Sequence, residues 1–193
     1  MIIGITGGTG SGKTTLLKLL AENGFTVMDC DTIYHDLLKT DKNMLSAIEA
    51  RFPGTVTDGV LNRKKLGNVV FSDPAALLAL NAITHAAVKS EVIRILESTS
   101  DSVAIDAIGL FEGGLAELCR LTVAVSAPEE LRVQRLMKRD GISESYARAR
   151  IAAQRSQGEF EKLCDVTLVN DGTEEAFQEK CLAFLRQQGI MKV

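Results

Sequence analysis

The chain has 193 residues, of which 46% are hydrophobic and 24% charged, the balance of a globular protein with a sizeable core. This length suits one domain with an insertion better than two domains. The net charge of −3 excludes a general attraction to nucleic acid or to an anionic membrane. Because the sequence has no apolar run of about eighteen residues, no basic leader and no clustered cysteines, we expect a cytoplasmic protein with reduced thiols and no zinc site.

The first predicted elements are a buried strand over residues 2–6 and a helix over residues 15–21. Between them residues 7–14 read Gly-Gly-Thr-Gly-Ser-Gly-Lys-Thr, a full match to G-x-x-x-x-G-K-[ST] in a strand–loop–helix setting. The glycines let the backbone curl so that several N–H groups point at one anion, and the helix N-terminus adds its positive dipole end. The motif predicts a phosphate-binding loop that comprises Gly8, Thr9, Gly10, Ser11, Gly12, Lys13, Thr14 and Thr15.

Two side chains of this loop are expected to act on a bound nucleotide. Lys13 would bridge the β- and γ-phosphates, and the Thr14 hydroxyl would ligate Mg²⁺.

A second strand is predicted over residues 25–29, with Asp31 just beyond it, at the edge where α/β sheets bind ligands. Asp31 either faces the phosphates or caps the next helix, residues 32–38, and the two roles are compatible. His35 follows in that helix and His85 lies in a later one. A lone helical histidine is usually structural, so the pattern by itself leaves both roles open.

Residues 41–100 show a helical pattern with a break at residues 51–54 and a turn at Asp58-Gly59. Asp73-Pro74 predicts the N-cap and first position of a long helix. We expect an apolar face of this helix to pack against the sheet, with Leu77, Leu78, Ile83, Val88, Val92, Ile95 and Leu96 on it.

A third strand, residues 103–106, ends in Asp106, and a carboxylate in this place of P-loop proteins often holds Mg²⁺ through water. Strands over residues 121–125 and 166–169 complete the set. A terminal helix over residues 174–188 is expected to turn inward Phe177, Cys181, Phe184 and Leu185.

Because helices connect these five strands, the sheet is expected to be parallel and covered on both faces. The predicted fold is therefore an α/β three-layer sandwich of the P-loop kinase type, with a helical acceptor-binding insert and a helical lid. It forms a single domain over residues 1–193, divided into a core of about residues 1–31, 101–130 and 164–193, an acceptor-binding region of about residues 32–100 and a lid of about residues 139–160.

Three arginines precede the last strand on one predicted helix. Arg132, Arg135 and Arg139 are spaced i, i+3 and i+7 and share one helix face. A further predicted helix, from Ser143 to Gln154, carries more arginines. The spacing fits a solvated charge face and equally a lid whose arginines clamp phosphate oxygens.

Three classes of P-loop protein were compared with these residues. A GTPase needs the guanine-reading N-K-x-D, which the sequence lacks, and a motor-type ATPase module usually needs a much larger chain. A small-molecule kinase needs an acceptor site, a carboxylate near the γ-phosphate and closing cations. The chain offers all three, so the residues favour an ATP-dependent kinase of a small hydroxyl acceptor.

The chain also resembles the dephospho-coenzyme A kinase family over nearly its whole length. The ordered set of shared segments is more specific than the phosphate loop alone. It comprises residues 5–14, Val27 to Asp31 with His35, residues 58–66, residues 70–74, Leu80 to His85, Leu110-Phe111-Glu112, Arg135 to Asp140, Ala153-Gln154, and Asp165 with Asn170.

This resemblance implies that ATP phosphorylates the ribose 3′-hydroxyl of dephospho-coenzyme A, with Mg²⁺ as cofactor. Asp31 would accept or orient the hydroxyl proton. Lys13 and Arg139, with Arg135 as a further candidate, would neutralise charge on the moving phosphoryl group. Asn170 would lie by the adenine. The acceptor would be bound by Asp31, His35, His85 and Glu112.

The chain departs from the family pattern at a few positions. Asp29-Cys30-Asp31 replaces the usual Asp-Ala-Asp, Ile108-Gly109-Leu110 replaces Pro-Leu-Leu beside the expected acceptor pocket, and Ala86 replaces a proline. Another hydroxyl acceptor, such as a nucleoside or a shikimate-like alcohol, and a non-catalytic nucleotide-binding regulator are the alternatives. We expect a monomer by default, with an oligomer left open, and neither nucleic acid nor membrane as a partner.

Overall fold

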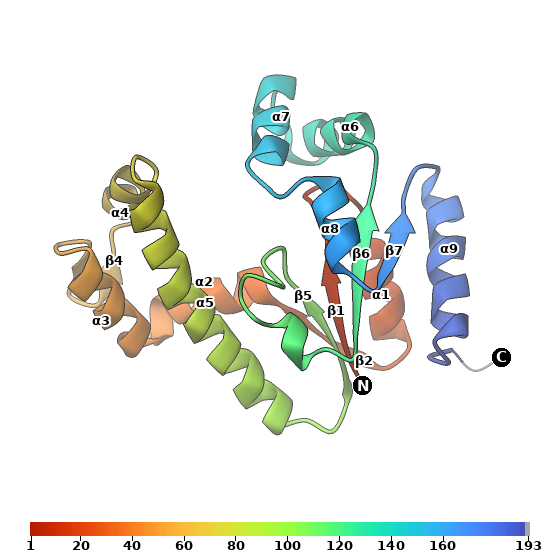
Figure 1. The fold of residues 1–193 in the computed structure, drawn as a ribbon, viewed down its shortest axis with the longest axis horizontal. Coiled ribbons are helices and arrows are strands. Elements are labelled where there is room, and N and C mark those ends of the chain that lie inside the picture. Colours follow the sequence, from red (N-terminus) through yellow and green to blue (C-terminus); the bar gives the residue numbers. More distant parts are fainter. Residues whose placement is uncertain (192–193) are drawn as a thin grey trace. The chain divides into compact units, whose positions relative to one another are not determined.

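Five short apolar segments form the central sheet. The computed structural model describes residues 1–191, and in it the strands are β1 (Ile2–Thr6), β2 (Phe25–Asp29), β5 (Ser102–Asp106), β6 (Leu121–Ser126) and β7 (Val166–Val169). Their order is β2-β5-β1-β6-β7 (Figure 1). Strand β1 pairs in parallel with β5 and β6, and β6 pairs in parallel with β7. The predicted parallel sheet with five strands is confirmed.

The main hydrophobic core lies between one sheet face and two helices. Ile3 and Ile5 of β1 are fully buried, and they pack against α1 (Lys13–Glu22) and α9 (Glu174–Gln187). The inward face predicted for the terminal helix is confirmed, since the buried residues of α9 are Phe177, Cys181, Phe184 and Leu185. On the sheet itself Gly4 has no side chain, which leaves room for Leu110 and Cys119.

Polar contacts fix the pairing of β6 with β7. Asp165 Oδ2 accepts hydrogen bonds from Thr122 N at 2.8 Å and from Thr122 Oγ1 at 2.7 Å, and Asp165 N donates to Thr122 Oγ1 at 3.0 Å. These donors hold the pKa of the Asp165 carboxyl below its usual value. Asp165 therefore helps to fix the register between β6 and β7 where the two strands begin.

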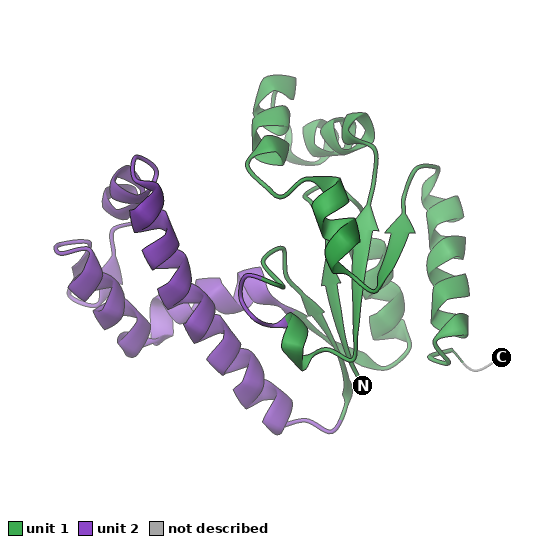
Figure 2. Ribbon diagram, viewed as in Figure 1, with its two compact units in different colours: residues 1–28, 101–111, 116–193 green, residues 29–100, 112–115 purple. Residues whose placement is uncertain are grey.

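The chain divides into two compact units, coloured green and purple in Figure 2. The first contains residues 1–28, 101–111 and 116 onward, with the sheet and its helices. The second contains residues 29–100 and 112–115. The chain thus leaves the first unit at the end of β2 and returns at the start of β5.

The second unit is helical. Its elements are α2 (Cys30–Thr40), α3 (Lys42–Arg51), a hairpin of β3 (Val56–Thr57) and β4 (Val60–Leu61), α4 (Arg63–Val70) and α5 (Pro74–Glu97). The side chains of Asp41, Asn62 and Asp73 cap α3, α4 and α5 by accepting backbone N–H groups. The sequence indicated the turn at Asp58-Gly59 but not the hairpin, because strands of two residues show no periodicity.

The buried face of α5 matches the predicted one only in part, since Val88 and Val92 are buried as expected. Leu77 and Leu78 were expected to be inward, but they are 37% and 70% exposed. The buried residues recur at every fourth position, which places them in one stripe: Ala76, Leu80, Thr84, Val88 and Val92. Helix α5 packs through this face against α2, α3 and α4. The buried hydroxyl of Thr84 donates to Leu80 O at 3.1 Å, so its hydrogen bond is made within the helix.

Helix α5 is also the one element among residues 1–191 that is long and apolar enough to cross a membrane by length and composition. Its mean hydropathy is 1.2 over an 18-residue window. Core helices of soluble proteins pass the same test; in α5 22% of that window is buried, and the helix packs against α2, α3 and α4.

Two helices that follow β6 form a hairpin with its own small core. They are α6 (Glu129–Asp140) and α7 (Glu144–Ala152), and their buried apolar residues are Val133, Leu136, Ala147 and Ile151. Arg148 donates to Glu129, Glu130 and Glu144, and Arg150 donates to Asp140. For these two arginines the interpretation as a surface charge face holds, because both serve as ties between α6 and α7.

The chain after this hairpin was predicted incompletely. The helix expected to reach Gln154 ends at Ala152, and a separate helix, α8 (Gln157–Leu163), follows. Helix α8 begins with a capping box of Ser156 and Glu159 and contacts β6.

We expect Phe177→Ala to lower the free energy of unfolding by about 3–5 kcal/mol, because it removes a ring that is 1% exposed in the main core. Urea unfolding followed by circular dichroism measures this change. Phe71→Ala is the control, since Phe71 is 86% exposed and should shift stability by less than about 0.5 kcal/mol. Equal losses in the two variants would contradict the assignment of the core.

Candidate active site

The glycine-rich loop joins β1 directly to α1. Gly12 is the N-cap of α1 in the left-handed region, with φ of 100° and ψ of 22°, a conformation that glycine adopts without a Cβ penalty. Within the loop Ser11 N donates to Gly8 O at 3.2 Å, and Thr15 N donates to Gly12 O at 3.1 Å. The loop thus forms a closed turn that ends at a helix N-terminus, as an anion site requires.

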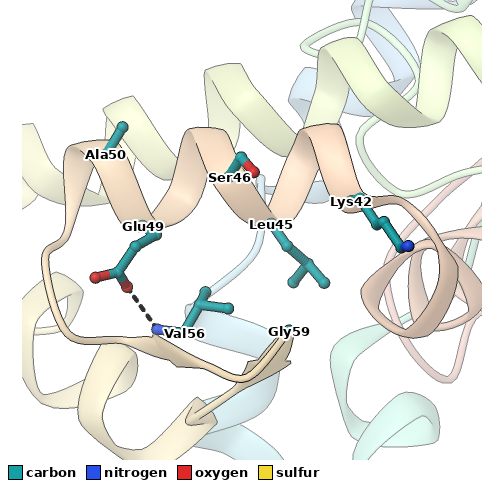
Figure 3. Close-up of a pocket in the computed structure, with 7 residues that line it drawn as sticks. All are labelled: Lys42, Leu45, Ser46, Glu49, Ala50, Val56 and Gly59. Atoms are coloured by element: carbon teal, nitrogen blue, oxygen red, sulfur yellow. Dashed lines mark hydrogen bonds between the residues drawn. The ribbon is translucent and has the colours of Figure 1, made fainter.

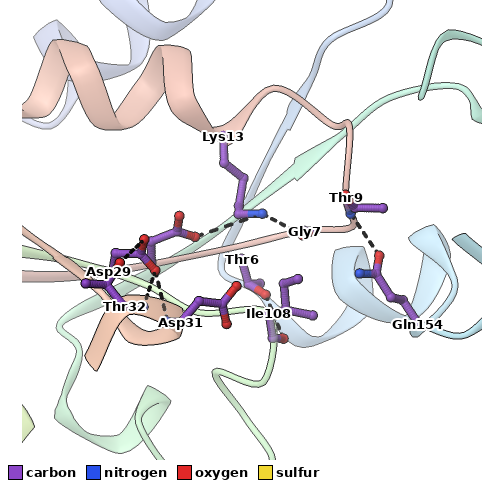
Figure 4. Close-up of polar contacts among 10 residues, drawn as sticks. Thr6, Gly7, Thr9, Lys13, Asp29, Asp31, Thr32, Ile108 and Gln154 are labelled. Atoms are coloured by element: carbon purple, nitrogen blue, oxygen red, sulfur yellow. Dashed lines mark hydrogen bonds and ion pairs between the residues drawn. The ribbon is translucent and has the colours of Figure 1, made fainter. Parts of the chain in front are cut away.

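Lys13, the first residue of α1, folds back over this loop. Its Nζ donates to Gly7 O at 3.0 Å and lies 3.9 Å from Asp106 Oδ1 (Figure 4). Asp106 is the last residue of β5, the neighbour of β1 in the sheet. The structure therefore brings together the loop, its lysine and the predicted magnesium carboxylate.

Donors from other elements hold the carbonyl groups of the loop. Arg132 Nε donates to Thr9 O at 2.8 Å, Arg135 Nη1 lies 3.4 Å from Gly10 O, and Asn170 Nδ2 donates to Ser11 O at 2.9 Å. In a planar trans peptide the N–H points opposite to the C=O. Holding the carbonyls of Thr9 and Ser11 therefore directs the N–H groups of Gly10 and Gly12 the other way, where they can face an anion.

Arg135 and Asn170, which both contact the loop, are also hydrogen-bonded to each other. Asn170 is 5% exposed, and its Oδ1 accepts a hydrogen bond from Arg135 Nη2 at 2.9 Å. Both polar atoms of the Asn170 amide are thus engaged within the first unit. The expectation that this stretch lies by the adenine stays a prediction, whereas contact between Asn170 and the loop is observed.

Two further residues at the loop were not expected to bind it. Arg132 is 5% exposed, so the interpretation as a solvated charge face is wrong for this arginine. Thr9 N donates to Gln154 Oε1 at 2.8 Å (Figure 4). The sequence places Gln154 in a segment shared with the resembling family, but no local pattern indicates its partner.

Arg139 lies at the C-terminal end of α6 and is paired. Its Nε donates to Asp140 Oδ1 at 2.6 Å, and its side chain is 60% exposed. This hydrogen bond, together with the one from Arg150, lowers the pKa of Asp140 to about 2. In this structure the arginine predicted to stabilise the transferred phosphoryl group forms a surface ion pair.

The oxygen atoms near the loop suit Mg²⁺. No group of three histidine, cysteine, aspartate or glutamate side chains within residues 1–191 could hold a metal by itself. Thr14 is exposed in the first turn of α1, and Asp106 offers a carboxylate. Mg²⁺ usually takes one or two such oxygens together with substrate phosphates, so the donor set fits the ion.

In the second unit Asp29, rather than Asp31, caps α2. Asp29 Oδ1 accepts hydrogen bonds from Asp31 N at 2.9 Å and Thr32 N at 3.3 Å (Figure 4). The alternative role of Asp31 as the N-cap is therefore wrong, because the preceding carboxylate takes the free N–H groups of the first turn. The Asp31 residue is exposed.

The predicted acceptor residues occupy varied positions in this unit. His35 is exposed and its ring centroid lies 5.7 Å from that of Tyr34. His85 is half-buried in α5, and Glu112 is exposed.

The second unit also contains two cavities. One of about 510 Å³ lies between α3 and the hairpin (Figure 3), where Glu49 accepts a hydrogen bond from Val56 N at 2.7 Å. A cavity of about 180 Å³ is lined by residues of α2, β4, α4 and α5, among them Tyr34 and Arg63, and by Phe71 at the end of α4. None of the predicted acceptor residues lines either cavity.

Comparisons with known proteins agree on one family. The family model for dephospho-CoA kinase matches residues 1–176. The chain is 38% identical over 192 residues to the dephospho-CoA kinase of Carboxydothermus hydrogenoformans, which covers 96% of this chain and 93% of the relative. The crystal structure of TT1252 from Thermus thermophilus matches with a TM-score of 0.82 and 34% identity, over 97% of both chains. Dephospho-CoA kinase from Campylobacter jejuni matches with a TM-score of 0.69 and 25% identity, over 98% of both chains.

We expect Gly12→Ala to weaken ATP binding about tenfold or more, because a left-handed non-glycine residue costs about 1–3 kcal/mol and its Cβ would collide with Asn170 Nδ2. Calorimetric titration with ATP measures the affinity. Gly158→Ala is the control, since a Cβ at Gly158 would meet nothing within 4 Å. Wild-type affinity in Gly12→Ala would contradict the constraint on the loop.

Proposed function

Since the chain belongs to the dephospho-CoA kinase family and catalyses the ATP-dependent phosphorylation of dephospho-CoA in coenzyme A biosynthesis, we propose roles for individual residues in that reaction. The observation that carries the proposal is the conformation of the phosphate loop. Arg132 and Asn170 donate hydrogen bonds to its carbonyl groups, and Lys13 folds back over the loop. A loop fixed in this way needs little reorganisation when the phosphates bind, which is the condition for efficient electrostatic stabilisation.

The loop N–H groups and Lys13 bind the β- and γ-phosphates of ATP. Lys13 Nζ would exchange its hydrogen bond to Gly7 O for phosphate oxygens, a favourable exchange because hydrogen bonds between charged groups are stronger. Thr14 and Asp106 would hold Mg²⁺, which when bound with ATP offsets the negative charge of the phosphates.

Asp31 is the proposed base for the attacking ribose 3′-hydroxyl. It lies three positions after Met28, the residue at which the chain leaves the first unit, and so follows the carboxyl end of a sheet strand. With Asp29 serving as the helix cap, the Asp31 carboxylate is left available to accept or orient the hydroxyl proton. We propose that His35, His85 and Glu112 contribute to binding dephospho-CoA, on the support of the family resemblance.

Arg139 is the proposed cation for the transferred phosphoryl group. Its present partner is Asp140, to which it donates two hydrogen bonds. Exchange of this partner for a phosphate that develops charge would leave Asp140 with its hydrogen bond from Arg150.

We expect Asp31→Asn to lower kcat about 10²–10⁴-fold, the usual contribution of a general base, while the Kd for ATP stays unchanged. ADP release in a coupled assay with ATP, Mg²⁺ and dephospho-CoA measures turnover, and calorimetry measures binding. Asp36→Asn, an exposed aspartate of the same helix, is the matched control and should keep full turnover. Equal turnover of Asp31→Asn and the wild type would remove Asp31 from the mechanism.

We expect Arg139→Ala to lower kcat about a hundredfold or more, as the loss of one stabilising donor does, with a much smaller change in the Kd for ATP. The same two assays separate these effects. Lys138→Ala, at the exposed neighbouring position, should behave like the wild type. Weaker ATP binding at unchanged kcat would show that Arg139 acts on the ground state only.

A further inference from the structure

A single residue of the phosphate loop, Thr9, is held through both of its backbone polar groups by one pair of side chains. Arg132 Nε donates to Thr9 O at 2.8 Å, and Thr9 N donates to Gln154 Oε1 at 2.8 Å. Arg132 Nη2 lies 3.5 Å from the same Oε1. Both neighbours of Oε1 are donors, so the position requires an acceptor.

Arg132 carries a buried charge to which no carboxylate of the described residues is hydrogen-bonded, although the charge of Glu129 acts on it from a longer distance. Within residues 1–191 its hydrogen-bond partners are Thr9 O and Gln154 Oε1, and it takes part in no ion pair. Arg139, Arg148 and Arg150 of the same hairpin all have carboxylate partners. Burial lowers the pKa of Arg132 from its ordinary value, because taking a cation out of water disfavours its charged form.

The guanidinium lies directly against the loop. A Cβ on Gly8 would overlap Arg132 Nη2 and would lie 2.7 Å from Arg132 Cζ. The charge is therefore separated from the phosphate side of the loop by little more than the backbone. In a buried setting such a charge acts across the loop with little screening by solvent.

The neutral side chain at position 154 is informative. A glutamate carboxylate would accept the same hydrogen bonds from Thr9 N and Arg132, and hydrogen bonds to a charged acceptor are stronger. Hydrogen bonding alone would therefore favour glutamate. Glutamate would also cancel the charge of Arg132, which a glutamine leaves intact.

We propose that Arg132 and Gln154 are positioning residues that hold Thr9 while they keep a net positive charge behind the phosphate loop, and that this charge strengthens binding of the nucleotide polyphosphate. The inference rests on the proposed binding of ATP phosphates by this loop. Arg132 comes from α6 and Gln154 follows α7, so the same contacts tie both helices of the hairpin to the loop.

The experiment compares Gln154→Glu with Gln154→Ala. Gln154→Glu keeps an acceptor for Thr9 N, so it should unfold at a temperature no lower than the wild type. It should nevertheless weaken ATP binding about tenfold or more, because it neutralises Arg132, and it should do so more than Gln154→Ala. The loss should decrease from ATP to ADP to AMP, since the effect acts on phosphate charge.

Two further variants test the charge itself. Arg132→Lys should bind ATP more tightly than Arg132→Met, because lysine keeps the positive charge and loses only the planar arrangement of guanidinium donors. Gln154→Glu should cost little when added to Arg132→Met, since its target is then gone.

Wild-type ATP affinity in Gln154→Glu, a larger loss in Gln154→Ala, or equal losses for ATP and AMP would each overturn the inference. These outcomes are distinct from a failure of the proposed function. In that case the wild type itself would bind no ATP at this loop, and Gly12→Ala would change nothing.

Discussion

The conformation of the phosphate loop depends on hydrogen bonds that other side chains donate to its peptide carbonyl groups. An anion site built from backbone N–H groups needs those groups to point one way, and each planar peptide then turns its carbonyl the other way. In this chain Arg132 and Asn170 supply donors for the carbonyls of Thr9 and Ser11. Without such donors these polar groups would lose hydrogen bonds on burial, at a cost of about 1–3 kcal/mol each. The binding side of the loop is thus stabilised from its opposite side.

The arginines of α6 and α7 differ in the groups that they contact. Arg132 and Arg135 contact carbonyl groups and neutral amides, and neither is hydrogen-bonded to a carboxylate in the described part of the chain. Arg148 and Arg150 contact carboxylates and tie α6 to α7. Arg139 lies at the end of α6 with an exchangeable surface partner. The same residue type therefore serves for loop support, hairpin cohesion and, as we propose, transition-state stabilisation.

The two units differ in architecture. The first holds the phosphate loop on a sheet whose core is formed by α1 and α9. The second is a helical unit in which α5 packs against α2, α3 and α4. Asp31 belongs to the second unit but follows the end of a strand that begins in the first. The carboxylate proposed as the base is therefore linked by only a few residues to the sheet that carries the phosphate loop.

The amino-acid sequence by itself determined the five strands of the parallel sheet, the phosphate loop, the Asp73 cap of α5 and the inward face of α9, because these follow from local signals: apolar periodicity, glycine spacing and capping side chains. It identified Lys13, Asp31 and Arg139 as candidates through a motif and a family resemblance. Only the tertiary structure decided which face α5 buries, that Asp29 caps α2, and which arginines meet carbonyls or carboxylates. Thr9 meets Arg132 from 123 positions away and Gln154 from 145 positions away. The physical reason is that a helix pattern fixes which side chains share a face, whereas the partners of that face depend on how distant elements pack.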